Sequence, residues 1–284
     1  MRLTTIGIAL AAALLPGVAS GQQWRTIESA RQLTSTDELQ VTLTFAGGKF
    51  ELNPLPGKLL YQMQLHYDEQ ATDAMHEYEA ADHQLKLGMR NANMGFRALK
   101  AMKHDEGSSM TVGLNPTVPM KLELNLGGSE AEAELGGMSL KSLRIHMGLA
   151  GGKVAFSSAN LVEMDEMSID IGLGGAAIEN LGNANVAQIH VSGGMGGVQL
   201  EFGDKVMRDV RINADVAMSG LKIQVPESAG VSIQAATKMA SFKPQGLEKV
   251  DGAWVSPNWK QAATHVTIVA NTALGSLEVN HAAP

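Results

Sequence analysis

The feature that most constrains the fold of this chain is a strand-sized pattern that recurs every 20 to 24 residues. In each unit apolar and polar residues alternate over five positions, which is typical of a half-buried β-strand. The central residues of these strands stand 21, 24, 20 and 23 residues apart. A period of this length predicts a fold made by stacking like units. The strands are residues 122–126, 143–147, 167–171, 187–191 and 210–214.

Each unit has a second apolar position nine residues after its centre, with small residues such as Gly127-Gly128 or Ser219-Gly220 between the two. Glycine allows a strand to turn sharply because it has no side chain. The same offset of nine recurs from residue 41 to 50 and from 268 to 277, so the repeat reaches both ends of the chain. The second positions are Ala133, Val154, Ile178, Val198 and Leu221.

Two short strands cannot bury an apolar face alone, whereas stacked copies of the unit can. We therefore predict an all-β fold, a parallel β-solenoid or β-helix with short glycine corners. A sandwich of hairpins is the alternative, since short strands with regular turns also fit that class. The solenoid is preferred because hairpins do not require a fixed offset of nine.

Two segments depart from the repeat, residues 54–119 and 240–263, and we predict that they are irregular inserted loops that cap the solenoid. Within the first, residues 60–67 and 85–89 alternate like strands, and the polar residues 68–82 between them are expected to form a loop. Apart from these insertions, residues 22–284 are expected to form a single domain.

Residues 1–21 have the features of a secretory signal peptide: Arg2, an apolar run over residues 6–15, and small residues before Gln22. No later stretch reaches the ~20 apolar residues that a membrane-spanning helix needs. The chain contains no Cys, so it has no disulfide and no lipid-attachment site after the signal. We therefore expect an exported bacterial protein in the periplasm, on the outer cell surface or outside the cell.

The net charge of −7 argues against nucleic acid as a partner. We expect an envelope protein or a glycan as the partner of this exported acidic chain.

The repeat resembles the bacterial toast-rack, or "putative adhesin", domains, which include the C-terminal domain of LiaF-like envelope-stress proteins. The resemblance is carried by residues 119–128, 135–140, 143–148, 256–259, 267–269 and 275–279, and it covers roughly residues 111–280. It implies a single-stranded, right-handed β-solenoid in an envelope, adhesion or sensing context. It implies no chemistry, because the family has no agreed catalytic residues.

The candidate ligand surface is a column of polar residues, each directly after a strand centre. In a stacked solenoid such residues would lie one above another on the outer face, where imidazole, amide and carboxylate groups could bind a sugar or a metal. A flat face presents these groups in parallel, so the simpler interpretation is a solvated ladder, and we predict no metal site and no cofactor. The column consists of Asn125, His146, Asp170, His190 and Asn213.

A second candidate is the pair Trp254 and Trp259, which could form an aromatic platform for a glycan or peptide. The alternative is that the two rings cap the open end of the core. His66, Asp68, His76, Glu77 and His83 form the densest metal-like group, but their spacing matches no defined metal motif.

The sequence therefore predicts a non-enzymatic exported module with an adhesin-like, scaffold or binding role. Two alternatives remain, a polysaccharide-binding or polysaccharide-active β-helix protein and an accessory sensor of envelope stress. No Gly-x-Ser-x-Gly motif and no paired carboxylates of a hydrolase are present.

Overall fold

The computed structural model describes residues 23–91 and 107–281 of the chain. These residues are all-β, with about 70% of them in strands, and a short 3-10 helix, η2, lies at Leu181–Ala184. The strands are β1 (Trp24–Gln32), β2 (Leu39–Pro54), β3 (Leu59–Asp68), β4 (Thr72–Glu79), β5 (Gln84–Asn91), β6 (Ser109–Leu114), β7 (Met120–Glu134), β8 (Leu140–Met147), β9 (Gly151–Ala155), β10 (Met164–Glu179), β11 (Val186–Glu201), β12 (Val210–Val225), β13 (Gly230–Gln245), β14 (Glu248–Val250), β15 (Ala253–Val255) and β16 (His265–His281).

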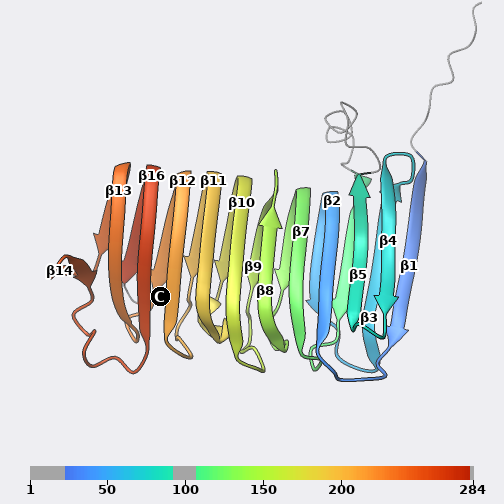
Figure 1. Cartoon of the computed structure of the whole chain (residues 1–284), viewed down its shortest axis with the longest axis horizontal. Coiled ribbons are helices and arrows are strands. Elements are labelled where there is room, and N and C mark those ends of the chain that lie inside the picture. The colour runs from blue at the N-terminus through green and yellow to red at the C-terminus, as the bar shows by residue number, and fades with distance from the viewer. Residues whose placement is uncertain (1–22, 92–106, 282–284) are drawn as a thin grey trace, which may run out of the picture.

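In most of the molecule, parallel strands lie side by side and follow one another along the long axis of the molecule (Figure 1). The long strands bend at a corner, so that one strand supplies both halves of a level. β10 shows this, because it pairs with β8 before its corner and with β9 after it. Ile169 and Ile178, nine residues apart, lie in these two halves. The sequence offset of nine therefore spans the corner of one bent strand.

Alternate residues of the bent strands point into a continuous apolar core. In β11, Ile189 and Leu200 are buried on either side of the corner. Each lies in register with an apolar residue of β12, Ile189 with Ile212 and Leu200 with Ile223. Aliphatic side chains thus stack in columns through the levels, and backbone ladders join each level to the next.

Two long strands enter the stack out of sequence order (Figure 1). β2 pairs with β7 on one side and with β5 and β6 on the other, so residues 59–91 and 109–114 lie beyond it. β16 lies between β12 and β13 and pairs in parallel with both. The final strand of the chain is therefore an inner level of the stack.

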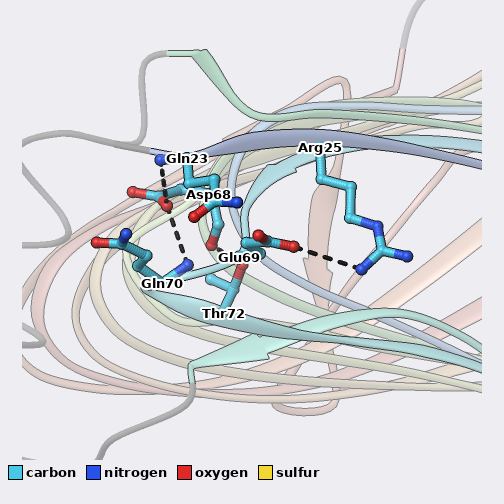
Figure 2. A network of polar contacts seen from close by, with 6 residues as sticks. All are labelled: Gln23, Arg25, Asp68, Glu69, Gln70 and Thr72. Atoms are coloured by element: carbon cyan, nitrogen blue, oxygen red, sulfur yellow. Dashed lines mark hydrogen bonds and ion pairs between the residues drawn. The ribbon is translucent and has the colours of Figure 1, made fainter. Parts of the chain in front are cut away.

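The N-terminal end of the stack is closed by antiparallel pairs, β1 with β3, β3 with β6, and β4 with β5. Figure 2 shows the polar contacts that hold the turn after β3. One carboxylate oxygen of Asp68 accepts the backbone N–H groups of Gln23, at 3.2 Å, and Gln70, at 3.0 Å. The Thr72 hydroxyl donates to the Asp68 carbonyl at 2.9 Å. This network ties the turn to the start of β1.

The strands expected at residues 60–67 and 85–89 are present as β3 and β5, but the prediction that the rest of 54–119 is irregular is wrong for its described part, because β4 and β6 also lie there. Residues 68–82 were expected to form a loop, yet they contain β4, which pairs with β5 over its whole length. Many of its residues are exposed, so the strand carries polar side chains and lacks a clear apolar alternation.

The prediction for 240–263 is wrong in the same way. Residues 240–245 form the second half of β13, and Ile233 and Phe242 of this strand stand nine residues apart, as in the other levels. The pattern is weak because β13 is the outermost long strand, and its residues after the corner are partly or fully exposed. The remainder of the segment includes β14 and β15, which pair with each other beside β13.

The expected signal peptide, residues 1–21, lies outside the described residues. Within residues 23–91 and 107–281, none of the helices has the length and apolar character needed to cross a membrane.

Candidate functional site

The candidate site lies along the corners of six neighbouring levels, formed by β8 with β9, β10, β11, β12, β16 and β13. The same four successive positions recur at each of these corners. In β10 these are Asp170, pointing outward, Ile171, pointing inward, Gly172, and Leu173 at the tip of the corner. Because parallel strands stack in register, each position forms a row along the molecule.

The tip position carries a row of large apolar side chains that we call the ridge. Its members are 40% to 80% exposed. Register places them side by side across β10, β11, β12, β16 and β13. Leu149 holds the same position next to Leu173, whose N–H donates to the Gly148 carbonyl at 2.7 Å. The ridge consists of Leu149, Leu173, Met195, Met218, Leu274 and Met239.

An open groove of about 1010 Å³ runs beside the ridge and takes three consecutive residues from each of the six levels. A smaller depression of about 420 Å³ lies after the corner, lined partly by Gly175, Gly197 and Gly220. The side chains of the ridge therefore stand between two hollows of the surface.

In five of the six levels the lining residue directly before the ridge is small, and these residues are Gly148, Gly172, Gly194, Ala217 and Ala273. A Cβ atom at Gly172 would lie 2.8 Å from the Gly148 carbonyl oxygen, and one at Gly194 would lie 2.7 Å from that of Gly172. The close approach of neighbouring corners therefore explains Gly172 and Gly194. Because these residues are small, they also leave the base of the ridge side chains uncovered.

A row of polar side chains, each three residues before a ridge residue in the chain, forms a wall of the groove. Nδ1 of His146 lies 3.1 Å from Oδ2 of Asp170, and the hydroxyl of Ser192 donates to Oδ1 of the same carboxylate. The Asn271 amide donates to Oδ1 of Asp215 at 2.7 Å. Both carboxylates are at least partly exposed and held by neighbouring levels, so the wall is acidic and ordered.

The structure brings together three residues of the expected polar column, since Asn125 pairs with His146 and His146 with Asp170. His190 and Asn213 pair with each other in the adjacent column, where His190 lies beside Ser168. The expected register is therefore wrong by two residues between β10 and β11. A shift of two keeps every side chain on the same face, so alternation alone cannot detect it.

Trp254 and Trp259 contact different partners. The ring of Trp254 packs edge-on against Phe242, with centroids 5.9 Å apart, and joins the margin of the core. Trp259 packs against His265 at 4.6 Å, and the Nε2 atom of that histidine lies 2.9 Å from the Trp259 carbonyl oxygen. Both rings are partly buried.

The contacts in the groove differ from those of known catalytic arrangements. His146, Asp170 and Ser192 meet with the carboxylate in the middle, whereas activation of a serine requires the histidine between serine and carboxylate. In the described part of the chain, no group of three or more His, Cys, Asp or Glu side chains is placed to hold a metal ion. His66 instead approaches Thr26, at 2.9 Å, and stacks on Trp24.

The ridge was not among the sites predicted from the sequence. Its signal was a Leu or Met directly after a small residue at successive corners, as in Gly172-Leu173, Gly194-Met195 and Ala217-Met218. It was overlooked because the tip lies between the two alternating segments, where the period of two breaks.

Solved structures with similar backbones were found at low sequence identity. A "putative cell adhesion protein" from Clostridium sporogenes matches with a TM-score of 0.44 and 13% identity, over 91% of this chain and 100% of that one. A "putative adhesin" from Bacteroides fragilis gives 0.44 and 9%, over 91% and 98%. A "putative lipid binding protein" from Parabacteroides distasonis gives 0.41 and 12%, over 91% and 96%.

No curated protein matches the chain. One family profile does, that of the N-terminal domain of toast_rack, DUF2154, over residues 19–179. The match ends with β10, while levels of the same kind continue through β11, β12, β16 and β13. Because it spans more than half of the sequence, this chain belongs to the toast_rack N-terminal domain family, DUF2154.

Proposed function

We propose that the protein is a non-catalytic binding module and that the ridge and its groove form the binding surface. The observation that carries this proposal is the row of six exposed Leu and Met side chains beside an open groove. Contiguous exposed apolar surface typically marks an interaction site. The stack itself does not need large residues at the corners, since β2 and β7 have Gly47 and Gly128 there.

We propose further that the stack is a right-handed β-solenoid. The parallel register of successive levels supports this proposal. Connections between parallel strands of one sheet are right-handed in about 98% of cases, because strand twist favours that hand. The partly buried Trp254 and Trp259 are proposed to cover the C-terminal end of the solenoid, which agrees with their separate packing contacts.

The proposed setting is the bacterial cell envelope or the space outside the cell. The signal-like residues 1–21 support export. The proposed partner is an envelope component that presents apolar groups, and neither a cofactor nor a catalytic step is part of the proposal. Asn125, His190 and Asn213 are proposed to be solvated polar residues of the strand face.

The proposal is tested by sedimenting the purified protein with the envelope fraction of the producing cells. The triple variant Leu173→Ser, Met195→Ser, Met218→Ser is expected to lose most sedimentation, because it removes the centre of the ridge. The control variant Leu161→Ser, Met207→Ser changes residues of 61% and 41% exposure that lie outside the ridge. It should sediment like wild type, and equal sedimentation of all three proteins would rule out the ridge as the binding surface.

A further inference from the structure

Building on the proposed binding function, we propose that the groove binds a basic amphipathic α-helix of a partner protein. Two unlike rows of side chains border the groove. The acidic row that contains Asp170 and Asp215 lines it, and the apolar ridge directly follows its lining residues in each level. A ligand that lies along it must therefore present an apolar stripe and a cationic stripe side by side. An amphipathic helix has this arrangement of surfaces.

The backbone pairing of the corners favours a helix over an extended peptide. A strand binds by adding to an open sheet edge, where unpaired N–H and C=O groups are available. At the groove the inner levels are already paired on both sides, as β11 is with β10 and β12. A helix satisfies its own backbone groups and needs only side-chain contacts.

The dimensions of the groove agree with a short helix. The six ridge residues are separated by five steps of ~4.8 Å, so the ridge is roughly 24 Å long, which corresponds to about 16 helical residues. Asp170 and Asp215 are two levels apart, with Ser192 between them. Their backbones are thus roughly 10 Å apart, close to the ~10.5 Å rise between helix residues that are seven apart.

The charges of the groove favour a cationic partner over an anionic lipid surface. Lys238, at the outermost level, is the only Lys or Arg among the lining residues of the groove. The net charge of the whole chain is −7, so longer-range attraction also favours a basic ligand. Three of the six ridge residues are Met, whose flexible side chains adapt to different apolar surfaces.

The inference is tested by fluorescence anisotropy with the full-length protein and a labelled 18-residue Leu/Lys peptide designed as an amphipathic helix. A second peptide of equal composition distributes its leucines evenly around the helix. Wild-type protein is expected to bind the first peptide at least tenfold more tightly. The ridge variant Leu173→Ser, Met195→Ser, Met218→Ser should abolish this preference, because the apolar stripe has then lost its partner.

The acidic wall is tested by the double variant Asp170→Asn, Asp215→Asn. The loss of two partly exposed charge contacts is expected to weaken binding of the amphipathic peptide about tenfold, or about 1.4 kcal/mol. The control variant Asp204→Asn, Asp251→Asn makes the same change in net charge at exposed sites outside the groove. It should bind like wild type within about twofold.

Three results would overturn the inference: no binding of the amphipathic peptide, equal binding of both peptides, or equal weakening by the groove and control Asp variants.

Anionic and zwitterionic lipid vesicles serve as competitors, and ridge-dependent binding to vesicles without peptide preference would assign the groove to a lipid surface instead. If the ridge variant still loses sedimentation with envelopes, only the helical partner is wrong. If the ridge variant changes neither assay, the proposed function fails as well.

Discussion

At the scale of single residues, the corner depends on a glycine that directly follows the tip in several levels. Gly174 and Gly196 have φ values of +138° and +145°, which L-residues rarely adopt. A Cβ atom at Gly196 would also overlap the carbonyl oxygen of Gly174. The two restrictions have one cause, because the tight corner brings the backbones of neighbouring levels together. Gly174 and Gly196 allow the chain to turn there, so that the preceding residues, Leu173 and Met195, project outward.

We expect Gly196→Ala to destabilise the protein by about 2 kcal/mol or more, because it combines an unfavourable φ with a backbone clash. The neighbouring Gly197→Ala is the matched control, since its Cβ would meet nothing nearer than the Gly220 carbonyl oxygen at 3.7 Å. Urea denaturation followed by circular dichroism measures both. Equal midpoints for the two variants would contradict this account of the corner.

At the scale of strands, the sequence predicts the long inner levels well and their arrangement only in part. Apolar alternation and the offset of nine locate both halves of β7, β10, β11 and β12, because the core requires an inward residue at every second position. The order of levels is not encoded in such local patterns. β16 has the same alternation whether it lies at the end of the stack or between β12 and β13.

The register between neighbouring strands cannot be predicted from apolar alternation, for a related reason. Pairing Ile169 with Ile189 or with Val191 buries the same faces, and the structure selects Val191. This choice moved His190 and Asn213 out of the column that contains His146 and Asp170. The candidate site was therefore only partly predictable: its polar wall follows from alternation, whereas the ridge lies at a break in it.

Cross-linking of cysteine pairs tests the register directly, since the chain contains no native Cys. Ser168→Cys with His190→Cys places two thiols on directly paired residues. This pair should react rapidly and quantitatively with a short bis-thiosulfonate cross-linker. Asp170→Cys with His190→Cys should react much more slowly, because its residues are offset by two positions. The reverse order of rates would contradict the observed register.

At the scale of the whole molecule, stacking converts one exposed residue per level into a continuous surface. A single exposed Leu or Met is ordinary on a protein surface and needs no explanation. Six such side chains in register beside a groove form an extended apolar edge. The acidic row of the groove runs along this edge, so the surface is apolar on one side and acidic on the other. The edge crosses the end of the family match at residue 179, so matched and unmatched levels form one surface.

The most direct test of the proposed binding surface measures protection of the ridge during binding. Single-cysteine variants Met195→Cys and Met218→Cys report on the ridge, and Met207→Cys reports on a residue of similar exposure outside it. Maleimide labelling rates are compared with and without the envelope fraction. We predict labelling at least fivefold slower at residues 195 and 218 in the bound protein, and unchanged at residue 207. Equal slowing at all three residues, or none at 195 and 218 when the protein is bound, would contradict the proposal.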